Sequence, residues 1–426
     1  MLLVKEKKET QLLELAKEYG NILLQERSGE NGLLGWKTGG KINPELLNWN
    51  NPENIDSGVS GLLLFLLELY KQTKEENYLA AVDQSIAGLV EYCKNTPTDN
   101  YGLYTGRSGV IYLLLQRYIL NGDDQLIAAC LELSKAADHR FLHSKYTTDY
   151  LYDGRAGALL TILHLYLISK EPFLLKYIYQ YLGFIMNNAK PGRQGIYWMN
   201  DEEFNIKPSC GFAHGSAGIR YVLQQVNRCV SNPALEMLID GAGKHANSCW
   251  VENFSNWGNF ENPIVSHHAL EMYKTRYAAN DARIFEPVNE YSWACGAAGM
   301  LLSLHDEQAA ERINEVSAKI TDPDAYRSIA SVSLYDGLAG LGMFYLSSEE
   351  YESNVKELVD AFTEKNFRLA EKMDTDGGLM HGNAGVFYFL LKASEENGVQ
   401  ENVLLPFANI SFDDSIFLKL SLNPSQ

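Results

Sequence analysis

A short glycine motif occurs seven times along this 426-residue chain and constrains its fold more than any other feature. Every copy has the pattern apolar-x-x-Gly-x-[Ser/Ala]-Gly-apolar, as in LYDGRAGA from Leu151 and FAHGSAGI from Phe212. Successive copies are 41 to 81 residues apart, a spacing typical of folds that repeat one supersecondary unit. The first glycines of the copies are Gly58, Gly106, Gly154, Gly215, Gly296, Gly337 and Gly382.

Each copy of the motif is followed by two segments with helical character. The motif opens an apolar stretch of helical length, as in residues 62–72 and 386–396. The segments between copies show helical periodicity, as in residues 78–94 and 173–189. Each repeat is therefore predicted to be a helical hairpin with a short apolar inner helix and a more amphipathic outer helix. The glycines at the inner-helix start would allow neighbouring backbones to approach closely.

The ends of the repeat array indicate how the hairpins assemble. An open solenoid is usually capped by atypical end repeats. Here the first and seventh copies fit the consensus as well as the middle ones, so a closed ring is favoured over an open solenoid. We expect an all-α fold, an α/α toroid (closed barrel) of seven helical-hairpin repeats. It should form a single domain over residues 1–426, with a longer insertion at about 245–290.

The composition disfavours several classes of partner. A net charge of −18 and a pI near 5.0 speak against nucleic acid or an anionic membrane surface. The short apolar run before Lys5 is too small for the core of a signal peptide. The longest apolar run, residues 158–169, is too short to span a bilayer. These features, with six cysteines in no CxxC spacing, predict a cytoplasmic protein with reduced thiols.

The residue directly before the first glycine is polar or chemically reactive in all seven copies. In a ring these positions lie at inner-helix N-termini and converge on one mouth of the central cavity. Helix dipoles and unpaired N–H groups there favour anionic intermediates such as thiolates or enolates. Two His, two Asp and one Cys suit an acid–base or metal site. The seven residues are Ser57, Thr105, Asp153, His214, Cys295, Asp336 and His381.

An ordinary structural role must be weighed at the same positions. Ser, Thr and Asp before a helix are common N-caps that satisfy its first amides. Capping is favoured for Ser57 and Thr105, and it stays open for Asp153 and Asp336. The two histidines and the cysteine are poorer caps, and a functional role is favoured most at His214.

The motifs resemble those of the lanthionine synthetase C-like (LanC-like) family over nearly the whole chain. FAHGSAG from Phe212 and the Ser292–Trp293 pair that opens the fifth motif are the most specific matches. The resemblance implies seven inner helices that begin at G-x-x-G, wrapped by seven outer helices. It also implies a cyclase that joins a peptide Cys thiol to dehydroalanine or dehydrobutyrine, with zinc lowering the pKa of the thiol. A precursor peptide would be the substrate, and a dehydratase is a further expected partner.

The resemblance assigns roles to individual residues in the third and fourth motifs. His214 falls on the family's fourth-motif His, which assists proton transfer. The family's third-motif Asp lies four or five residues before the glycine, where Asp149 matches, with Asp153 as a rival. The expected catalytic residues are therefore His214, Asp149 and Asp153, and the other cavity-mouth residues singled out are Cys295, Asp336 and His381.

The zinc ligands that the resemblance implies are not present in register. The family's Cys after the fifth-motif Trp is Ala294 here, and Cys295 comes one residue late, which turns a helical side chain by roughly 100°. Where the family has Cys-His in the sixth motif, this chain has Tyr335–Asp336. The seventh motif contains His381, but it comes one repeat too late. We expect zinc to be absent or weakly bound, while a metal held through Cys295, Asp336 or His381 stays open.

Two functions of different classes follow, and a third is weaker. The first is a thioether cyclase that works without zinc or with an altered site. The second is a catalytically degenerate LanC-like module that binds a peptide or docks a dehydratase. The third is a carbohydrate-active α/α toroid, which would need paired carboxylates such as Asp153 and Asp336. Retention of His214 favours the first, and a role in peptide modification is preferred.

Overall fold

The computed structural model is mostly helical, and its contacts group the chain into two compact units, each described by itself. Unit 1 comprises Met1–Ala137 and Lys319–Leu404, and unit 2 comprises Asp138–Ala318 and Leu405–Gln426. The single-domain prediction is not tested by this grouping and stays a prediction. The residues described are 2–30, 33–36, 52–135, 139–192, 194–199, 209–230, 232–252, 255–258, 291–304, 310–320, 331–363, 377–395 and 403–408, with single residues between 268 and 281 and at 329.

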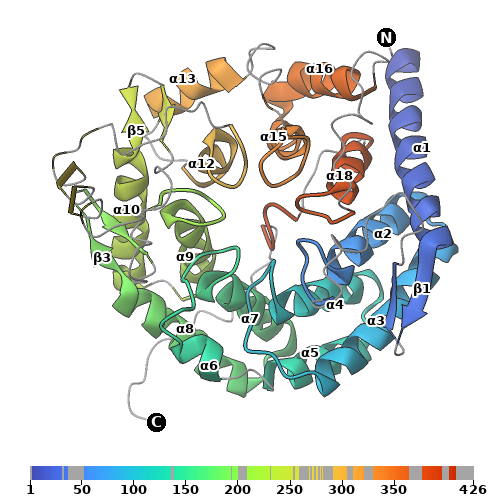
Figure 1. Cartoon of the computed structure of the whole chain (residues 1–426), viewed down its shortest axis with the longest axis horizontal. Helices are drawn as coiled ribbons and strands as arrows, with labels where there is room; N and C mark the ends of the chain where they lie inside the picture. The colour runs from blue at the N-terminus through green and yellow to red at the C-terminus, as the bar shows by residue number, and fades with distance from the viewer. Residues whose placement is uncertain are drawn as a thin grey trace. The chain divides into compact units, whose positions relative to one another are not determined.

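Unit 1 contains the first, second, sixth and seventh motifs. It also carries a two-stranded antiparallel hairpin, β1 (Arg27–Glu30) with β2 (Leu33–Trp36). Its helical elements are α1 (Leu2–Glu26), α2 (Val59–Thr73), α3 (Glu76–Asn95), α4 (Arg107–Asn121), α5 (Asp124–Lys135), α15 (Leu338–Tyr345), η3 (Glu349–Tyr351), α16 (Glu352–Thr363) and α18 (Asn383–Ala393) (Figure 1).

Unit 2 contains the third, fourth and fifth motifs. Two short hairpins pair β3 (Lys190–Pro191) with β4 (Ile196–Tyr197) and β5 (Trp250–Val251) with β6 (Asn256–Trp257). The predicted insertion at about 245–290 is described only in part, and most of it lies outside the described residues. The helices are α6 (His139–His143), α7 (Arg155–Ser169), α8 (Pro172–Asn188), α9 (Ser216–Val230), α10 (Pro233–Ser248), α12 (Ala297–Ser303) and most of α13 (Ala310–Ile320).

The glycine motif sets the start of every inner helix. The helices α2, α4, α7, α9, α12, α15 and α18 each begin one residue after the first glycine of a motif. The inner helices are buried nearly all round: every residue of α7 from Arg155 to Leu167 is buried. The outer helix α3 buries one stripe that includes Tyr78, Ala81, Val82 and Ser85. The predicted division into apolar inner and amphipathic outer helices is confirmed in these elements.

The second glycine of the motif permits close packing between neighbouring repeats. A Cβ added at Gly218 would lie 1.9 Å from the carbonyl oxygen of Phe212, and 3.1 Å from Cβ of Leu151 in the preceding motif. A Cβ at Gly61 would lie 2.8 Å from Cβ of Leu379, in the seventh motif. Only glycine fits at these positions, because an added Cβ would overlap with atoms of its own motif and of the neighbouring repeat.

Backbone hydrogen bonds link the motif loops within each unit. In unit 2 the N–H of Tyr152 donates to the carbonyl of Ala213 (3.1 Å), and the N–H of Ala213 donates to Ala294 (2.9 Å). All three residues stand two positions before the first glycine of their motif. The loops of the third, fourth and fifth repeats are therefore held in one register.

The same ladder in unit 1 joins the last repeat to the first. Tyr335 donates to Met380 (2.9 Å), Met380 donates to Asp56 (3.0 Å), and Asp56 donates to Tyr104 (3.0 Å). These residues also stand two positions before the first glycine. Helix α18 contacts both α1 and α2, and the red and blue helices lie side by side in Figure 1. Within unit 1 the seventh repeat therefore packs directly against the first.

A buried charge cluster fastens α18 to α2. Nζ of Lys392 lies 2.5 Å from Oε2 of Glu68 and 2.9 Å from Oε1 of Glu395. Glu68 also pairs with Lys71 through its other oxygen. Burial alone would raise the pKa of Glu68, but Lys392 and Lys71 outweigh that effect and hold it below its usual value. The cluster therefore favours the ionised carboxylate between the first and last inner helices.

Candidate functional site

His214 and Asp153 face each other across two neighbouring repeats of unit 2. Nδ1 of His214 lies 3.6 Å from Oδ1 of Asp153. Each residue stands directly before the first glycine of its motif, so the loop ladder between Tyr152 and Ala213 sets their spacing. Their side chains are 30% and 34% exposed, which leaves the pair within reach of a ligand. The structure therefore brings two of the three expected catalytic residues, His214 and Asp153, together.

Aromatic rings and a hydroxyl fix the orientation of this pair. The ring of Tyr150 lies edge-on to the imidazole of His214, with 5.8 Å between the ring centroids. The centroid of the Tyr152 ring lies 5.1 Å from that of the imidazole. Thr148 donates its hydroxyl to Oδ1 of Asp153 at 2.7 Å. Burial would raise the pKa of Asp153, but hydrogen bonding and charge from His214, with Thr148, lower it below its usual value. Asp153 is thus held as a carboxylate beside an imidazole.

Asp149 occupies a buried ion pair instead. Its Oδ1 lies 3.0 Å from Nη1 of Arg155, and its Oδ2 accepts a hydrogen bond from Asn188 at 2.8 Å. Arg155 also donates to the carbonyls of Leu142 and Ser144, so it ties the preceding loop to α7. Burial raises the pKa of Asp149, although Arg155 and Asn188 oppose that effect. Both carboxylate oxygens are engaged in holding the loop, and it is Asp153 that meets His214.

Cys295 lies beside the loop that carries His214. Its backbone N–H donates to the hydroxyl of Ser292 at 3.3 Å. A Cβ at Gly211 would come within 3.1 Å of Cα of Cys295, so the two loops touch. Five of the six cysteines are buried, whereas Cys295 is partly exposed. Cys295 therefore presents a thiol close to the fourth motif.

Asp336 in unit 1 is held by the hydroxyls of its own loop. Its Oδ1 accepts hydrogen bonds from the hydroxyls of Ser331 (2.7 Å) and Ser333 (2.6 Å). Its own N–H donates to Ser333 at 3.1 Å. Among the described residues no side chain caps α15, whose first amides donate to backbone carbonyls of the preceding loop, so Asp336 stabilises the loop and does not act as the helix N-cap that the sequence left open.

His381 pairs with a carboxylate that the sequence analysis did not single out. Nε2 of His381 lies 3.5 Å from Oδ1 of Asp56, and the ring of Tyr335 lies 4.4 Å away. Asp56 stands two residues before Gly58, where the other six copies have Tyr, Ala or Met. That single acidic exception is the signal that would have identified it.

The residues at the family's zinc-ligand positions do not fit a zinc site. Ala294 is buried and has no donor side chain, while its carbonyl accepts the N–H of Ala213. Tyr335 and Asp336 replace a thiolate and an imidazole, and Asp336 is held by serine hydroxyls. Across the part of the chain that the structure describes, no three His, Cys, Asp or Glu side chains gather in a way that could hold a metal.

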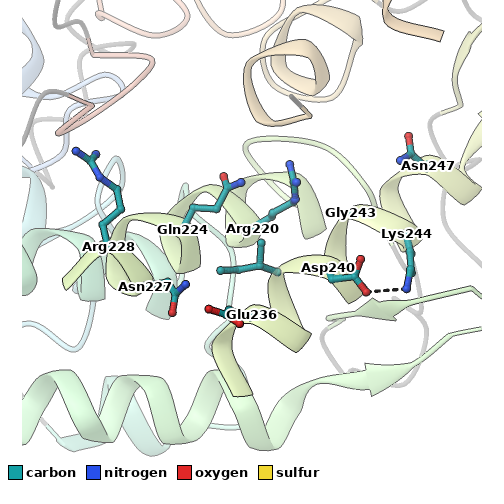
Figure 2. A pocket seen from close by; sticks show the side chains of 10 residues that line it. Arg220, Gln224, Asn227, Arg228, Glu236, Asp240, Gly243, Lys244 and Asn247 are labelled. Carbon is teal, nitrogen blue, oxygen red and sulfur yellow. Dashed lines mark ion pairs between the residues drawn. The ribbon is translucent and has the colours of Figure 1, made fainter. Parts of the chain in front are cut away.

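A polar pocket of about 660 Å³ lies along the α9–α10 hairpin of unit 2. Figure 2 shows Arg220, Gln224 and Arg228 projecting from one side of α9, with the ion pair of Asp240 and Lys244 (2.7 Å) on α10. The remaining lining residues are Asn227, Glu236, Ile239, Gly243 and Asn247. This volume is in the range of ligand pockets.

Within the described helices, none is long and apolar enough to cross a membrane.

The inner helices begin after motif glycines, and a His–carboxylate pair lies directly before two of these helices. These features are those of a helical-hairpin repeat protein of the LanC type. The family model for lanthionine synthetase C-like proteins matches residues 50–322 and 328–410. The chain belongs to the lanthionine synthetase C-like family. No curated protein matches the sequence.

Solved structures support the same fold. The chain is similar to nisin cyclase, with 18% sequence identity and a TM-score of 0.62 over 80% of this chain and 88% of that one. The predicted all-α toroid is thereby confirmed as the fold class. An α-1,6-mannanase of Salegentibacter sp. matches at 11% identity and a TM-score of 0.44 over 91% and 99% of the two chains. An unsaturated glucuronyl hydrolase from Streptococcus agalactiae gives the same identity and TM-score over 91% of each chain.

Proposed function

We propose that the protein is a lanthionine cyclase-like enzyme that modifies a ribosomally made peptide in the cytoplasm. It adds peptide Cys thiols to dehydrated Ser or Thr residues and so forms thioether rings. One observation carries the proposal: the half-exposed His214 imidazole is paired with the Asp153 carboxylate at 3.6 Å. A base oriented by a carboxylate is the arrangement that general acid–base catalysis requires.

The chemistry needs one proton to move from sulfur to carbon. The thiol proton is removed, and the sulfur electron pair forms the C–S bond to the β-carbon of the dehydro residue. The π electrons of that residue move toward its carbonyl as an enolate, and the α-carbon then takes a proton. His214 takes part in this proton exchange, while Asp153 orients the ring and stabilises the imidazolium.

The site is proposed to work without zinc. The expected metal positions carry Ala294 and Tyr335, which offer no thiolate. Thiol activation then depends on protein bases alone, so the loss of such a base should be more severe than in a zinc enzyme.

The alternative is a LanC-like module that binds a peptide, or docks a dehydratase, without chemistry. Its support is the loss of the zinc-ligand residues together with the polar pocket on the α9–α10 hairpin, where Arg220 is buried and Lys244 is exposed (Figure 2). A binding module retains peptide affinity when His214 is replaced and forms no ring.

The test uses a dehydrated model peptide with one Cys and one dehydroalanine, incubated with the full chain in the presence and absence of a zinc chelator. Thiol alkylation followed by mass spectrometry counts the unreacted cysteines. The proposal expects ring formation that the chelator leaves unchanged. Equal thiol counts with and without protein, for a peptide that demonstrably binds, support the binding module instead.

A further inference from the structure

A second His–carboxylate pair lies in unit 1, between the seventh and first repeats. Nε2 of His381 is 3.5 Å from Oδ1 of Asp56. The N–H of Met380 donates to the carbonyl of Asp56 at 3.0 Å, which holds the two loops in this register. Like His214 and Asp153, the pair joins a histidine before a motif glycine to a carboxylate of a neighbouring motif, but here the carboxylate stands two residues before its glycine and faces Nε2. A His–carboxylate pair therefore lies beside the loop ladder in each unit.

The exposure of the two side chains suits proton transfer to a ligand. The His381 side chain is 40% exposed, so its ring is open to an incoming group. Asp56 is 23% exposed, and its Oδ1 atom, which faces the ring, is itself buried. At 3.5 Å the carboxylate acts on the ring through its charge and stabilises the cation formed when the ring takes a proton. Nε2 faces this carboxylate, so Nδ1 is the nitrogen that would accept a proton from a ligand.

The position of His381 relates the pair to the missing metal site. The ring of Tyr335 lies 4.4 Å from the imidazole, and its N–H donates to Met380 at 2.9 Å. Tyr335 stands where the resemblance places a thiolate ligand of zinc. The imidazole of His381 thus contacts Tyr335, which cannot act as that thiolate ligand. Among the residues that the structure describes, Asp56 from the first motif and Tyr335 from the sixth are titratable groups that contact it.

We propose that His381, oriented by Asp56, takes the proton of the peptide cysteine thiol. The inference rests on the proposed function, and every contact that carries it lies within unit 1. The S–H bond breaks, the proton moves to Nδ1 of His381, and the sulfur electron pair forms the C–S bond to the β-carbon. The imidazolium then releases its proton to solvent, and the α-carbon takes a proton by way of His214, so the addition is balanced and needs no oxidant.

The experiment measures ring formation by the full chain on the one-Cys dehydrated peptide at pH 7 and pH 9. His381→Gln keeps the size and polarity of the side chain without its basicity, and Asp56→Asn removes the orienting charge. We expect His381→Gln to slow ring formation at pH 7 by about 10²-fold or more, since general bases contribute roughly 10²–10⁴-fold. At pH 9 the loss should shrink to tenfold or less, because a free thiol with a pKa near ~8.5 ionises unaided.

The controls separate the inference from the proposed function. His268→Ala, at an exposed histidine, should match wild type at both pH values. Asp56→Asn should lie between wild type and His381→Gln, with the same shrinkage at pH 9. Wild-type ring formation with His381→Gln unimpaired, or impaired equally at both pH values, overturns the role of His381 and leaves the proposed function standing. Wild type that forms no ring at either pH retires the proposed function, and this inference with it.

Discussion

The N–H of Met380 donates to the carbonyl of Asp56 across 3.0 Å, so the seventh motif is hydrogen-bonded to the first. The same ladder position carries Asp56 into contact with His381. A single backbone register thus joins the ends of the repeat array and builds a reactive pair. The cluster of Glu68 and Lys392 fastens the helices that follow these two motifs.

The buried pair of Glu68 and Lys392 should contribute strongly to stability. Lys392→Met leaves the Glu68 carboxylate buried with Lys71 as its remaining cation, and breaking such a pair costs roughly 3–5 kcal/mol. Chemical denaturation of the variant should show a correspondingly lower free energy of unfolding. The double variant Glu68→Leu with Lys392→Leu should lose far less, because no charge is left buried. A single variant as stable as wild type contradicts this account.

The same cluster predicts a specific dependence of stability on pH. The pKa of Glu68 is lower in the folded state than its ordinary value of 4.5, so the stability it contributes is complete above that value. As the pH falls through the folded pKa, this contribution is lost. The difference in free energy of unfolding between wild type and Glu68→Gln should therefore narrow steadily below pH 4.5. A difference that stays constant from neutral to acid pH speaks against the ionised pair.

Gly218 should tolerate no side chain. In Gly218→Ala the new Cβ would meet the Phe212 carbonyl at 1.9 Å and Leu151 at 3.1 Å, and overpacking of this kind costs about 1–3 kcal/mol or more. Gly183, in the outer helix α8, is the matched control because a Cβ there meets nothing within 4 Å. Gly183→Ala should be stabilising by roughly 1 kcal/mol through helix propensity. Thermal melting of both variants decides whether the close contact with the Phe212 carbonyl, rather than helix propensity, requires glycine at this position.

Variants of Asp149 and Asp153 should differ in their effects on stability and on ring formation. Asp149→Asn removes the carboxylate that neutralises the buried Arg155, so its melting temperature should fall clearly. Asp153→Asn leaves that ion pair intact and should melt close to wild type, with ring formation slowed through His214. Melting curves and thiol counts on the same preparations test this assignment. The reverse pattern would return the catalytic role to Asp149.

The repeat architecture could be predicted from the sequence because each motif glycine determines the structure of the few residues around it. Each inner helix begins directly after its first glycine, and the second glycine is required by contacts that the motif itself creates. The pairing of carboxylates with histidines was harder to predict. Asp149 and Asp153 are close in sequence, and their roles differ because Arg155 forms an ion pair with Asp149. Asp56 is far from His381 in the chain, and only the contact between the last and first repeats brings them together.

The most direct measurement is ring formation by His214→Ala on the matched dehydrated peptide, counted by mass spectrometry after thiol alkylation. The methyl side chain of alanine cannot transfer the proton that the α-carbon of the enolate takes, so the rate should fall by about 10²–10⁴-fold. His268→Ala, at an exposed histidine, should leave the rate unchanged. This outcome, with folding and peptide affinity retained in both variants, is what the account predicts. Ring formation by His214→Ala at the wild-type rate would contradict it.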